Sequence, residues 1–412
     1  MCIRDRSNCP FYSWQLDEDK SYTGSCLNFH YMSRIDLLRW VLTGGSPKSC
    51  SNNNQNCDPR LNTSDKYNGG SDIMLTTYSG VNVLVPISRI NNSLLLSLAN
   101  STQSTKPRIG LEMFSGNVNA NKVYIGDYTL SNDADPKNPY TNLIKMVNSA
   151  VPGGATATGP AMKAALDYFN QSKLNIGTDC KGRGYSYTNS FSFSKTTWKD
   201  PMYQPCKTDC VTKNCSFCSA ECANNYIILM SDGDWNTGGD PLKPAWYMHN
   251  KFSRNLNNTN FTINKVYTVG MFLPSGTGYC GFNALKNVSL YGSNTFNSYP
   301  LDCPSCSSEC QNTNCYCYTP NPDPTTTNPP TAFSANNASE LKNSLSAIFQ
   351  DIAKNVSSGS SAAITSSSNQ GSVLLQSVFW PEKTFDDGAK VSWVGKLYAW
   401  WLQNLPGSAP QI

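Results

Sequence analysis

The sequence predicts an α/β fold, with a mostly parallel sheet and helices on both faces, followed by the first strands of an all-β domain. Strand-like apolar segments alternate with segments of helical spacing as far as Val356, which is typical of a covered parallel sheet. The stretch YIILMSDGDWN at 226–236 is an apolar run that stops at small and acidic residues, as expected of a strand buried on both faces. Over 372–402 the helical spacing disappears, and β-branched and aromatic residues alternate instead.

The first element is an amphipathic helix over residues 33–43, which the pair Gly44-Gly45 ends. Its expected buried face consists of Ile35, Leu38, Val41 and Leu42. The next elements are strands at 81–87, 108–114 and 122–128, and a helix at 140–151.

A second amphipathic helix follows the loop GGATATG. Its apolar positions recur at i, i+3, i+4 and i+7, in Met162, Ala165, Leu166 and Phe169. Pro160 falls in the first turn, where a missing N–H is tolerated.

After the strand that ends at Asp232, four further elements are expected: a helix at 244–256, a strand at 263–272, and helices at 282–290 and 338–356. The last helix begins with Asn337 and Glu340 at capping-box spacing. Its apolar stripe consists of Leu341, Leu345, Ile348, Phe349 and Ile352.

The domain organisation follows from changes in composition. The first seven residues, MCIRDRS at 1–7, resemble a translated sequencing adapter. We expect an α/β domain over 8–356 that lacks its first strand, a Ser-rich linker at 357–371, and the start of a β-domain at 372–412. Polar and Cys-rich insertions interrupt the α/β domain near 46–70, 175–223 and 302–333.

The chain has 17 cysteines, and two groups of them lie at 206–222 and 303–317. Zinc is one reading, since Cys215/Cys218 and Cys303/Cys306 form CxxC pairs. Disulfides within each group are favoured, because a charged fraction of 15% and only two histidines fit an exported protein better. Without Cys2, which belongs to the adapter-like segment, 17 − 1 = 16 cysteines remain for pairing.

The charge pattern and hydropathy exclude two classes of partner. The net charge of +4 is small and forms no basic block, so nucleic-acid binding has no support. No apolar run approaches the roughly 18 residues of a transmembrane segment. No signal peptide opens the sequence, and we expect it to have been lost upstream, because the first seven residues resemble a sequencing adapter and the cysteines indicate export.

Two segments have the chemistry of a cation site. The loop GGATATG precedes a helix, and IILMSDGD ends a strand, which resembles the von Willebrand factor type A domain with its Rossmann-like fold. That resemblance implies a metal-ion-dependent adhesion site in which Thr156 and Asp232 bind Mg²⁺, or Mn²⁺ or Ca²⁺, and a partner supplies a further oxygen. Hydroxyl and carboxylate oxygens are the ligands that hard cations prefer. Thr158 is expected to be a structural residue of the helix N-terminus.

The family's third loop, D-x-S-x-S, has no convincing counterpart. Asp19-Lys20-Ser21-Tyr22-Thr23 is similar, but the residues before it do not form a buried strand. We therefore expect the true loop to lie upstream of the present sequence and expect metal binding without it to be weak.

The order of several phrases is similar to that in PilY-type pilus-tip adhesins. These are CLNFHYMSRIDLLRWVLTGG, GGATATGPAM, IILMSDGDWN, VYTVGMF, ELKNSLSAIFQDIAKNV, SVLLQSVFWPEKTF and VSWVGKLYAWWL. The resemblance implies a type A domain before a β-propeller, with the W-x-G-x-L phrase at 393–397 marking the propeller's start. It also implies a non-enzymatic protein at the cell surface, pilus tip or outer membrane, whose partners are type IV pilus components and a host-cell, matrix or abiotic surface.

Two other functions compete with this reading. An EF-hand starting at Asp232 fails because Thr237 and Lys243 stand where Gly and Glu are required. A secreted, metal-dependent phosphatase of the haloacid-dehalogenase type would use Asp232 as nucleophile and Asp234 as acid/base. Asn236 departs from that motif, and the Gly-rich loop would have no role.

The remaining residues with chemical potential are assigned to packing. His30 and His249 lie beside aromatic residues and have no catalytic partners in the sequence, so structural roles are expected. Trp393, Trp400 and Trp401 are read as β-domain core and not as a carbohydrate platform.

Overall fold

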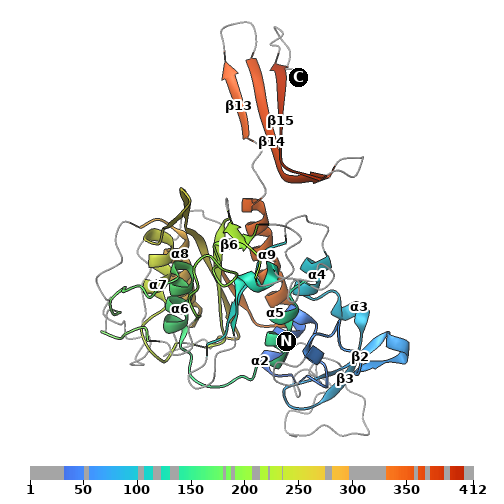
Figure 1. Ribbon diagram of the computed structural model, residues 1–412. Coiled ribbons are helices and arrows are strands. Elements are labelled where there is room, and N and C mark those ends of the chain that lie inside the picture. Colours follow the sequence, from blue (N-terminus) through green and yellow to red (C-terminus); the bar gives the residue numbers. More distant parts are fainter. Residues whose placement is uncertain are drawn as a thin grey trace, which may run out of the picture. The chain divides into compact units, whose positions relative to one another are not determined.

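The computed structural model describes most of the chain between residues 32 and 402. The described ranges are 32–50, 55–100, 106–114, 122–129, 139–179, 182–186, 191–206, 214–220, 223–233, 235–273, 281–296, 331–356, 361–366, 372–384 and 390–402. The chain divides into two compact units, Met1–Ser346 and Ala347–Ile412 (Figure 1). No helix within the described ranges is both long and apolar enough to cross a bilayer.

The centre of the first unit is a parallel sheet with the strand order β12-β11-β8. Its strands are β8 (Asn225–Ser231), β11 (Ile263–Met271) and β12 (Ala332–Ala335). Three helices cover one face: α6 (Thr158–Asn170), α7 (Leu242–Asn250) and α8 (Gly281–Ser293) (Figure 1). Gly292 lets α8 lie against β11 and α7, since a Cβ there would stand 2.5 Å from Val266 Cβ and 3.3 Å from Ala245 Cβ. The predicted mixed α/β fold with a parallel sheet is confirmed.

The strand β8 differs from the expectation of burial on both faces. Leu229 is 5% exposed, but Ile227, Ile228 and Met230 are only half-buried. In the described part of the chain β8 pairs with β11 alone, so its second edge has no neighbouring strand there. An apolar run predicts that a strand lies in a hydrophobic environment, but it does not predict how many other elements pack against that strand.

The N-terminal part of the first unit surrounds a separate apolar cluster. Its helices are α2 (Arg34–Thr43), α3 (Ile87–Ile90), α4 (Leu94–Asn100) and α5 (Thr141–Ser149). Its strands are β1 (Lys66–Tyr67), β2 (Asp72–Thr76) and β3 (Asn82–Pro86), which form an antiparallel sheet, and the short pair β4 (Leu111–Glu112) and β5 (Lys122–Val123). The predicted strands at 108–114 and 122–128 are therefore shorter than expected, and β5 leads into a 3₁₀ helix at Ile125–Thr129.

Helix α2 ends at Gly44 (φ 83°), as predicted, but its buried face is only partly the apolar one that was expected, since Val41 is buried as predicted and polar residues join it. Asp36 and Arg39 are buried, whereas Ile35, Leu38 and Leu42 are half-buried. The polar side chains tolerate burial because they bond to each other and to backbone groups: Arg39 Nη1 donates to Asp36 Oδ1 at 3.4 Å, and the Tyr78 N–H donates to Asp36 Oδ1 at 2.8 Å.

The helix predicted at 244–256 also needs correction. It starts earlier and stops at Asn250, and residues 254–256 form β9 (Arg254–Leu256), which pairs with β10 (Thr259–Phe261). Asn257 and Asn258 have φ of 48° and 66°, which suits a tight hairpin turn. The helical spacing of apolar residues continues beyond Asn250 in the sequence, so spacing alone did not predict where the helix ends and the hairpin begins.

Within the predicted insertion at 175–223, β6 (Tyr203–Pro205) and β7 (Phe217–Ser219) form a short antiparallel pair. The disulfide Cys206–Cys218 closes the same segment, and Cys215 is disulfide-bonded as well. A second disulfide, Cys50–Cys57, lies in the predicted insertion near 46–70. The group at 303–317 lies outside the described residues.

Helix α9 (Ala338–Val356) begins with the predicted N-cap bond, since the Glu340 N–H donates to Asn337 Oδ1 at 2.9 Å. The Glu340 carboxylate accepts the Asn336 N–H at 2.8 Å and a bond from Asn337 Nδ2, where a capping box would use the Asn337 N–H. Beyond it, the chain forms an antiparallel sheet of β13 (Ser361–Ser366), β14 (Ser372–Thr384) and β15 (Lys390–Leu402), in that order. Strand β13 falls inside the segment predicted as linker at 357–371. The β-sheet expected over 372–402 is present, while the propeller stays a prediction.

Candidate functional site

The two predicted site loops lie against each other at the carboxyl end of β8. The Asn236 N–H donates to the Thr156 carbonyl at 3.1 Å, and the Thr156 N–H donates to Asn236 Oδ1 at 2.8 Å. The Cβ position of Gly233 is 3.8 Å from Thr156 Oγ1, so the threonine hydroxyl lies over the turn that directly follows Asp232. The carboxyl edge of a parallel sheet is where α/β folds bind ligands.

The turn after β8 is set by Ser231. Its hydroxyl donates to the Gly233 carbonyl at 2.7 Å and accepts the Gly233 N–H at 3.4 Å. This local hydrogen bonding ends the strand and turns the backbone at Asp232, whose side chain is 53% exposed. Asp234, the second acidic residue of this loop, lies outside the described residues.

The other loop is held by the first turn of α6. Gly159 packs so closely on the backbone of Gly239 and Asp240 that no Cβ would fit there. Thr158, the first residue of α6, is 2% exposed, and its Oγ1 has no hydrogen-bond partner among the described residues. Thr158 therefore has the helix N-terminal position predicted for it, with a buried hydroxyl that the described part of the chain does not satisfy.

The carboxylate of Asp232 is paired with Arg34, the first residue of α2. Arg34 Nη1 donates to the Asp232 carbonyl at 2.9 Å and to Asp232 Oδ2 at 3.4 Å. The guanidinium also lies 5.9 Å from the centre of the Phe272 ring, just beyond the end of β11. Sequence reasoning missed Arg34 because its contact joins residues 198 positions apart.

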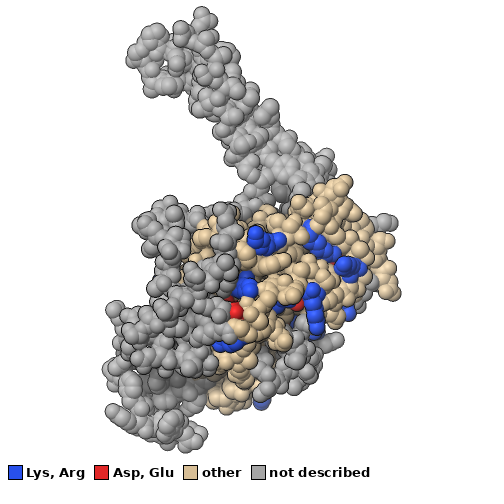
Figure 2. All heavy atoms as spheres, turned by 90° about the vertical axis from the view of Figure 1, so that its left-hand side faces the viewer, with Lys and Arg blue, Asp and Glu red and all other residues tan. Residues whose placement is uncertain are grey.

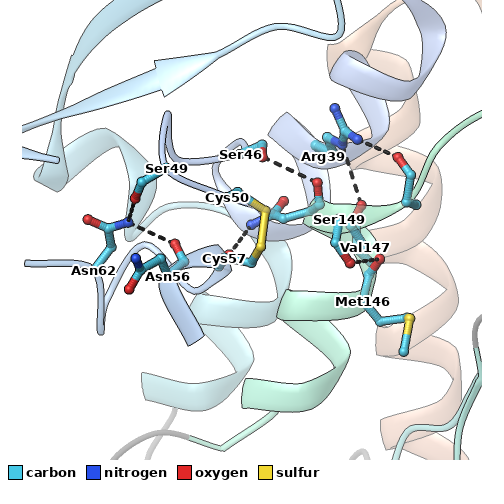
Figure 3. The surroundings of a disulfide bond; sticks show 12 residues. Arg39, Ser46, Ser49, Cys50, Asn56, Cys57, Asn62, Met146, Val147 and Ser149 are labelled. Carbon is cyan, nitrogen blue, oxygen red and sulfur yellow. Dashed lines mark hydrogen bonds between the residues drawn. A yellow bond between two sulfur atoms is a disulfide. The ribbon is translucent and has the colours of Figure 1, made fainter. Parts of the chain in front are cut away.

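Helix α2 is also fastened to the segment that leads into the Gly-rich loop. Arg39 Nε donates to the Val147 carbonyl at 3.4 Å, and Arg39 Nη2 donates to the Ala150 carbonyl (Figure 3). Burial lowers the pKa of Arg39, and the neighbouring Asp36 carboxylate opposes that effect. One helix thus touches the strand end that carries Asp232 and the stem of the loop that carries Thr156.

The Cys50–Cys57 disulfide braces the same region. Asn148 Nδ2, from α5, donates to the Cys57 carbonyl at 2.7 Å, and Ser46 Oγ donates to the Asn148 carbonyl at 3.2 Å (Figure 3). Thr43 Oγ1 and Asn148 Oδ1 are 2.6 Å apart. The disulfide loop and the end of α2 are therefore bonded to α5 through buried polar groups.

The donors available at this edge suit a hard divalent cation. Thr156 offers a hydroxyl oxygen and Asp232 a carboxylate, which are the ligand types Mg²⁺ and Mn²⁺ take. Within the described ranges no group of three or more His, Cys, Asp or Glu side chains that could hold a metal ion is assembled.

Among the described residues, those of the competing zinc and histidine sites take part in cross-linking and packing. Cys218 is bonded to Cys206, so the pair Cys215/Cys218 is not a zinc knuckle. His249 Nδ1 lies 3.3 Å from the Ile263 carbonyl, a packing contact beside the sheet. His30 lies outside the described residues.

A cavity of about 240 Å³ beside α6 contains neither predicted site residue. Its buried charges, Lys163 and Asp167, pair with each other at 2.6 Å, and the Leu174 N–H donates to the same carboxylate at 2.8 Å. Lys163 and Asp167 therefore satisfy each other, and this pair is not an unpaired charge available to a ligand.

The face beside α6 and α7 shows more Lys and Arg than Asp and Glu (Figure 2). The imbalance arises because nearby carboxylates are buried: Asp167, Asp179, Asp200 and Asp240 are all 7% exposed or less. Lys199, Lys251 and Lys286 instead lie over the rings of Trp198, Trp246 and Phe282. Each of these three lysines lies over a different aromatic ring, so their ammonium groups do not form one anion-binding site.

Comparison with known proteins finds one family. Residues 11–112 match the family described as PilY1 homolog, small alpha/beta domain. The match supports a PilY1-type protein, and its described part includes α2, β1 to β3, α3 and α4. No curated protein and no solved structure matches the chain. Arg34 and Arg39 belong to the matched segment, so residues of that segment contact the candidate site.

Proposed function

We propose that this protein is a type IV pilus-associated, surface-exposed adhesin and pilus biogenesis factor that binds a partner through a divalent-cation site. The PilY1-type match supports the association with pili. The disulfides Cys50–Cys57 and Cys206–Cys218 support an oxidising, exported location at the cell surface, pilus tip or outer membrane.

The observation that carries the proposal is the meeting of the Thr156 loop with the Asp232 turn at the carboxyl end of a parallel strand. In the proposed site Thr156 and Asp232 hold Mg²⁺, or Mn²⁺ or Ca²⁺, and a bound cation would accept an oxygen of the partner in a remaining coordination position. Asn236 holds the two loops in register. Arg34 balances the Asp232 charge before a cation binds.

In this proposal the partner is a host-cell, matrix or abiotic surface, and the protein is not an enzyme. The Cys206–Cys218 bridge spans 12 positions, and Cys50–Cys57 spans seven, so both segments would resist extension under load. Such stiffening suits a protein that transmits tension along a pilus.

Deletion and complementation in the bacterium that carries the gene test the proposal. Deletion should reduce piliation, twitching and adhesion, while secreted phosphatase activity should not change. Complementation with Asp232→Ala should restore piliation but not cation-dependent adhesion, whereas Asp72→Ala, a matched surface carboxylate on β2, should restore both. Normal motility and adhesion after deletion would refute the pilus role, and loss of phosphatase activity would favour a hydrolase.

A further inference from the structure

We propose that Arg34 is an internal latch on Asp232, which must release the carboxylate before a divalent cation binds there. The inference rests on the proposed function, because it concerns the affinity of the same site. It assigns a regulatory role to the segment at 11–112 that matches the PilY1 homolog family, called the small alpha/beta segment below. Through α2, this segment controls how readily the cation binds.

The contact geometry makes the two occupants antagonistic. Arg34 Nη1 bonds both to the carbonyl and to Oδ2 of Asp232, so it occupies the side of the residue where negative charge is concentrated. A divalent cation on the same carboxylate would face the guanidinium charge at short range. Binding of the cation therefore requires the Arg34 side chain to move away.

The Arg34–Asp232 pair is built differently from the structural ion pairs. Both of its side chains are 53% exposed. By contrast, Arg254–Asp200 has exposures of 10% and 0%, and Lys163–Asp167 has 9% and 9%. An exposed pair is weakly held and can exchange partners, whereas a buried pair that loses one member leaves an uncompensated charge.

The rest of α2 is fixed, so opening the latch does not require the helix to unfold. Asp36 accepts the Ser33 N–H at 2.9 Å and the Tyr78 N–H at 2.8 Å, and Thr43 Oγ1 donates to the Arg39 carbonyl at 2.7 Å. Arg39 binds the carbonyls of Val147 and Ala150. Only the exposed side chain of the first helical residue has to change rotamer.

Because α2 is bonded to the rest of the first unit, a movement of the small alpha/beta segment would change the Arg34–Asp232 contact. A displacement of α2 would shift Arg34 relative to Asp232 and would pull on Val147 and Ala150, immediately before the loop that carries Thr156. Force or a partner acting on that segment would thereby change the population of the open site. The apparent affinity of a site falls by the fraction of molecules that are competent to bind.

The test compares the full protein with Arg34→Gln and with Arg89→Gln, which removes an equal charge from an exposed position on α3. Mn²⁺ binding is measured by calorimetry and by the rise in thermal midpoint. If the latch is closed in about nine molecules of ten, Arg34→Gln should tighten Mn²⁺ binding about tenfold. Arg89→Gln should bind Mn²⁺ like the wild type, and adding Asp232→Asn to Arg34→Gln should abolish the gain.

The outcomes separate the two proposals. Mn²⁺ binding that is present in the wild type but unchanged by Arg34→Gln would overturn the latch and leave the cation site standing. An equal gain in Arg34→Gln and Arg89→Gln would also overturn it, because only general charge would be involved. No Mn²⁺ response in either the wild type or Arg34→Gln would overturn the cation site itself, and the latch with it.

Discussion

Thr156 and Asn236, 80 residues apart, are joined by two hydrogen bonds: the Asn236 N–H bonds to the Thr156 carbonyl, and Asn236 Oδ1 accepts the Thr156 N–H. This pair aligns the Gly-rich loop with the turn after β8. The first bond uses backbone alone, whereas the second needs the Asn side chain, so residue 236 can be tested separately from the fold.

Asn236→Ala should loosen the alignment of the two loops. Losing one exposed hydrogen bond should lower the free energy of unfolding by about 0.5–1.5 kcal/mol and weaken Mn²⁺ binding. Asn255→Ala, which removes an exposed side-chain bond to Asn260 in the β9–β10 hairpin, is the matched control and should not affect Mn²⁺. Equal Mn²⁺ titrations for Asn236→Ala and the wild type would show that the alignment does not matter for the site.

Asp232→Ala should remove the rise in thermal midpoint that Mg²⁺ or Mn²⁺ produces in the full protein. A ligand at 100 times its dissociation constant stabilises the native state by about 2.7 kcal/mol, which a thermal scan detects readily. Without the cation the variant should stay folded, because the Asp232 side chain is half exposed. A metal response that survives in Asp232→Ala would mean that the cation binds elsewhere.

The buried carboxyl group of Glu112 should make the stability of the protein depend on pH. Both of its carboxylate oxygens are buried without a hydrogen-bond partner in the described part of the chain, and this desolvation raises the pKa to about 8 from 4.5, although Lys122 opposes the shift. The native state keeps a proton that the unfolded chain releases. The free energy of unfolding should therefore fall by about 1.4 kcal/mol per pH unit between 4.5 and 8 on account of this group, and level off above 8.

Glu112→Gln, which is neutral at every pH, should abolish that decline. Urea unfolding at pH 5 and pH 9 measures the effect: the variant should equal the wild type at pH 5 and be more stable at pH 9. Asp72→Asn, which alters a carboxylate in an exposed hydrogen bond to Asn68, is the control and should leave the decline intact. Parallel pH profiles for wild type and Glu112→Gln would mean that the buried carboxyl finds a partner.

Replacing Cys206 and Cys218 together by Ser should destabilise the insertion that carries β6 and β7. Closing a loop of about 15 residues contributes about 3 kcal/mol in the chain-entropy model, and this bridge spans 12 positions. Limited proteolysis should cut the variant between β6 and β7 first. Peptide mapping of the unreduced wild-type protein should find the Cys206–Cys218 link, and free thiols or bound zinc there would contradict the assignment.

Much of the fold follows from patterns local in sequence. The alternation of strands and helices, the end of α2 at Gly44 and the N-cap bond between Asn337 and Glu340 all depend on spacing within one or two turns of chain. The predictions of secondary structure and burial were wrong where contacts with distant residues, and not the local pattern, decided the structure. The predicted helical spacing continued past Asn250, and the buried face of α2 contains an Asp36–Arg39 pair besides the predicted Val41.

For the candidate site, the sequence by itself determined the chemistry: a threonine in a Gly-rich loop, an aspartate after an apolar strand, and cysteines suited to an oxidising compartment. Only the tertiary structure decided that Asn236 bonds to Thr156 and that Arg34 covers Asp232. The physical reason is distance along the chain. Caps, turns and amphipathic faces form among neighbours, whereas an exposed Arg has no local preference that could announce a partner 198 residues away.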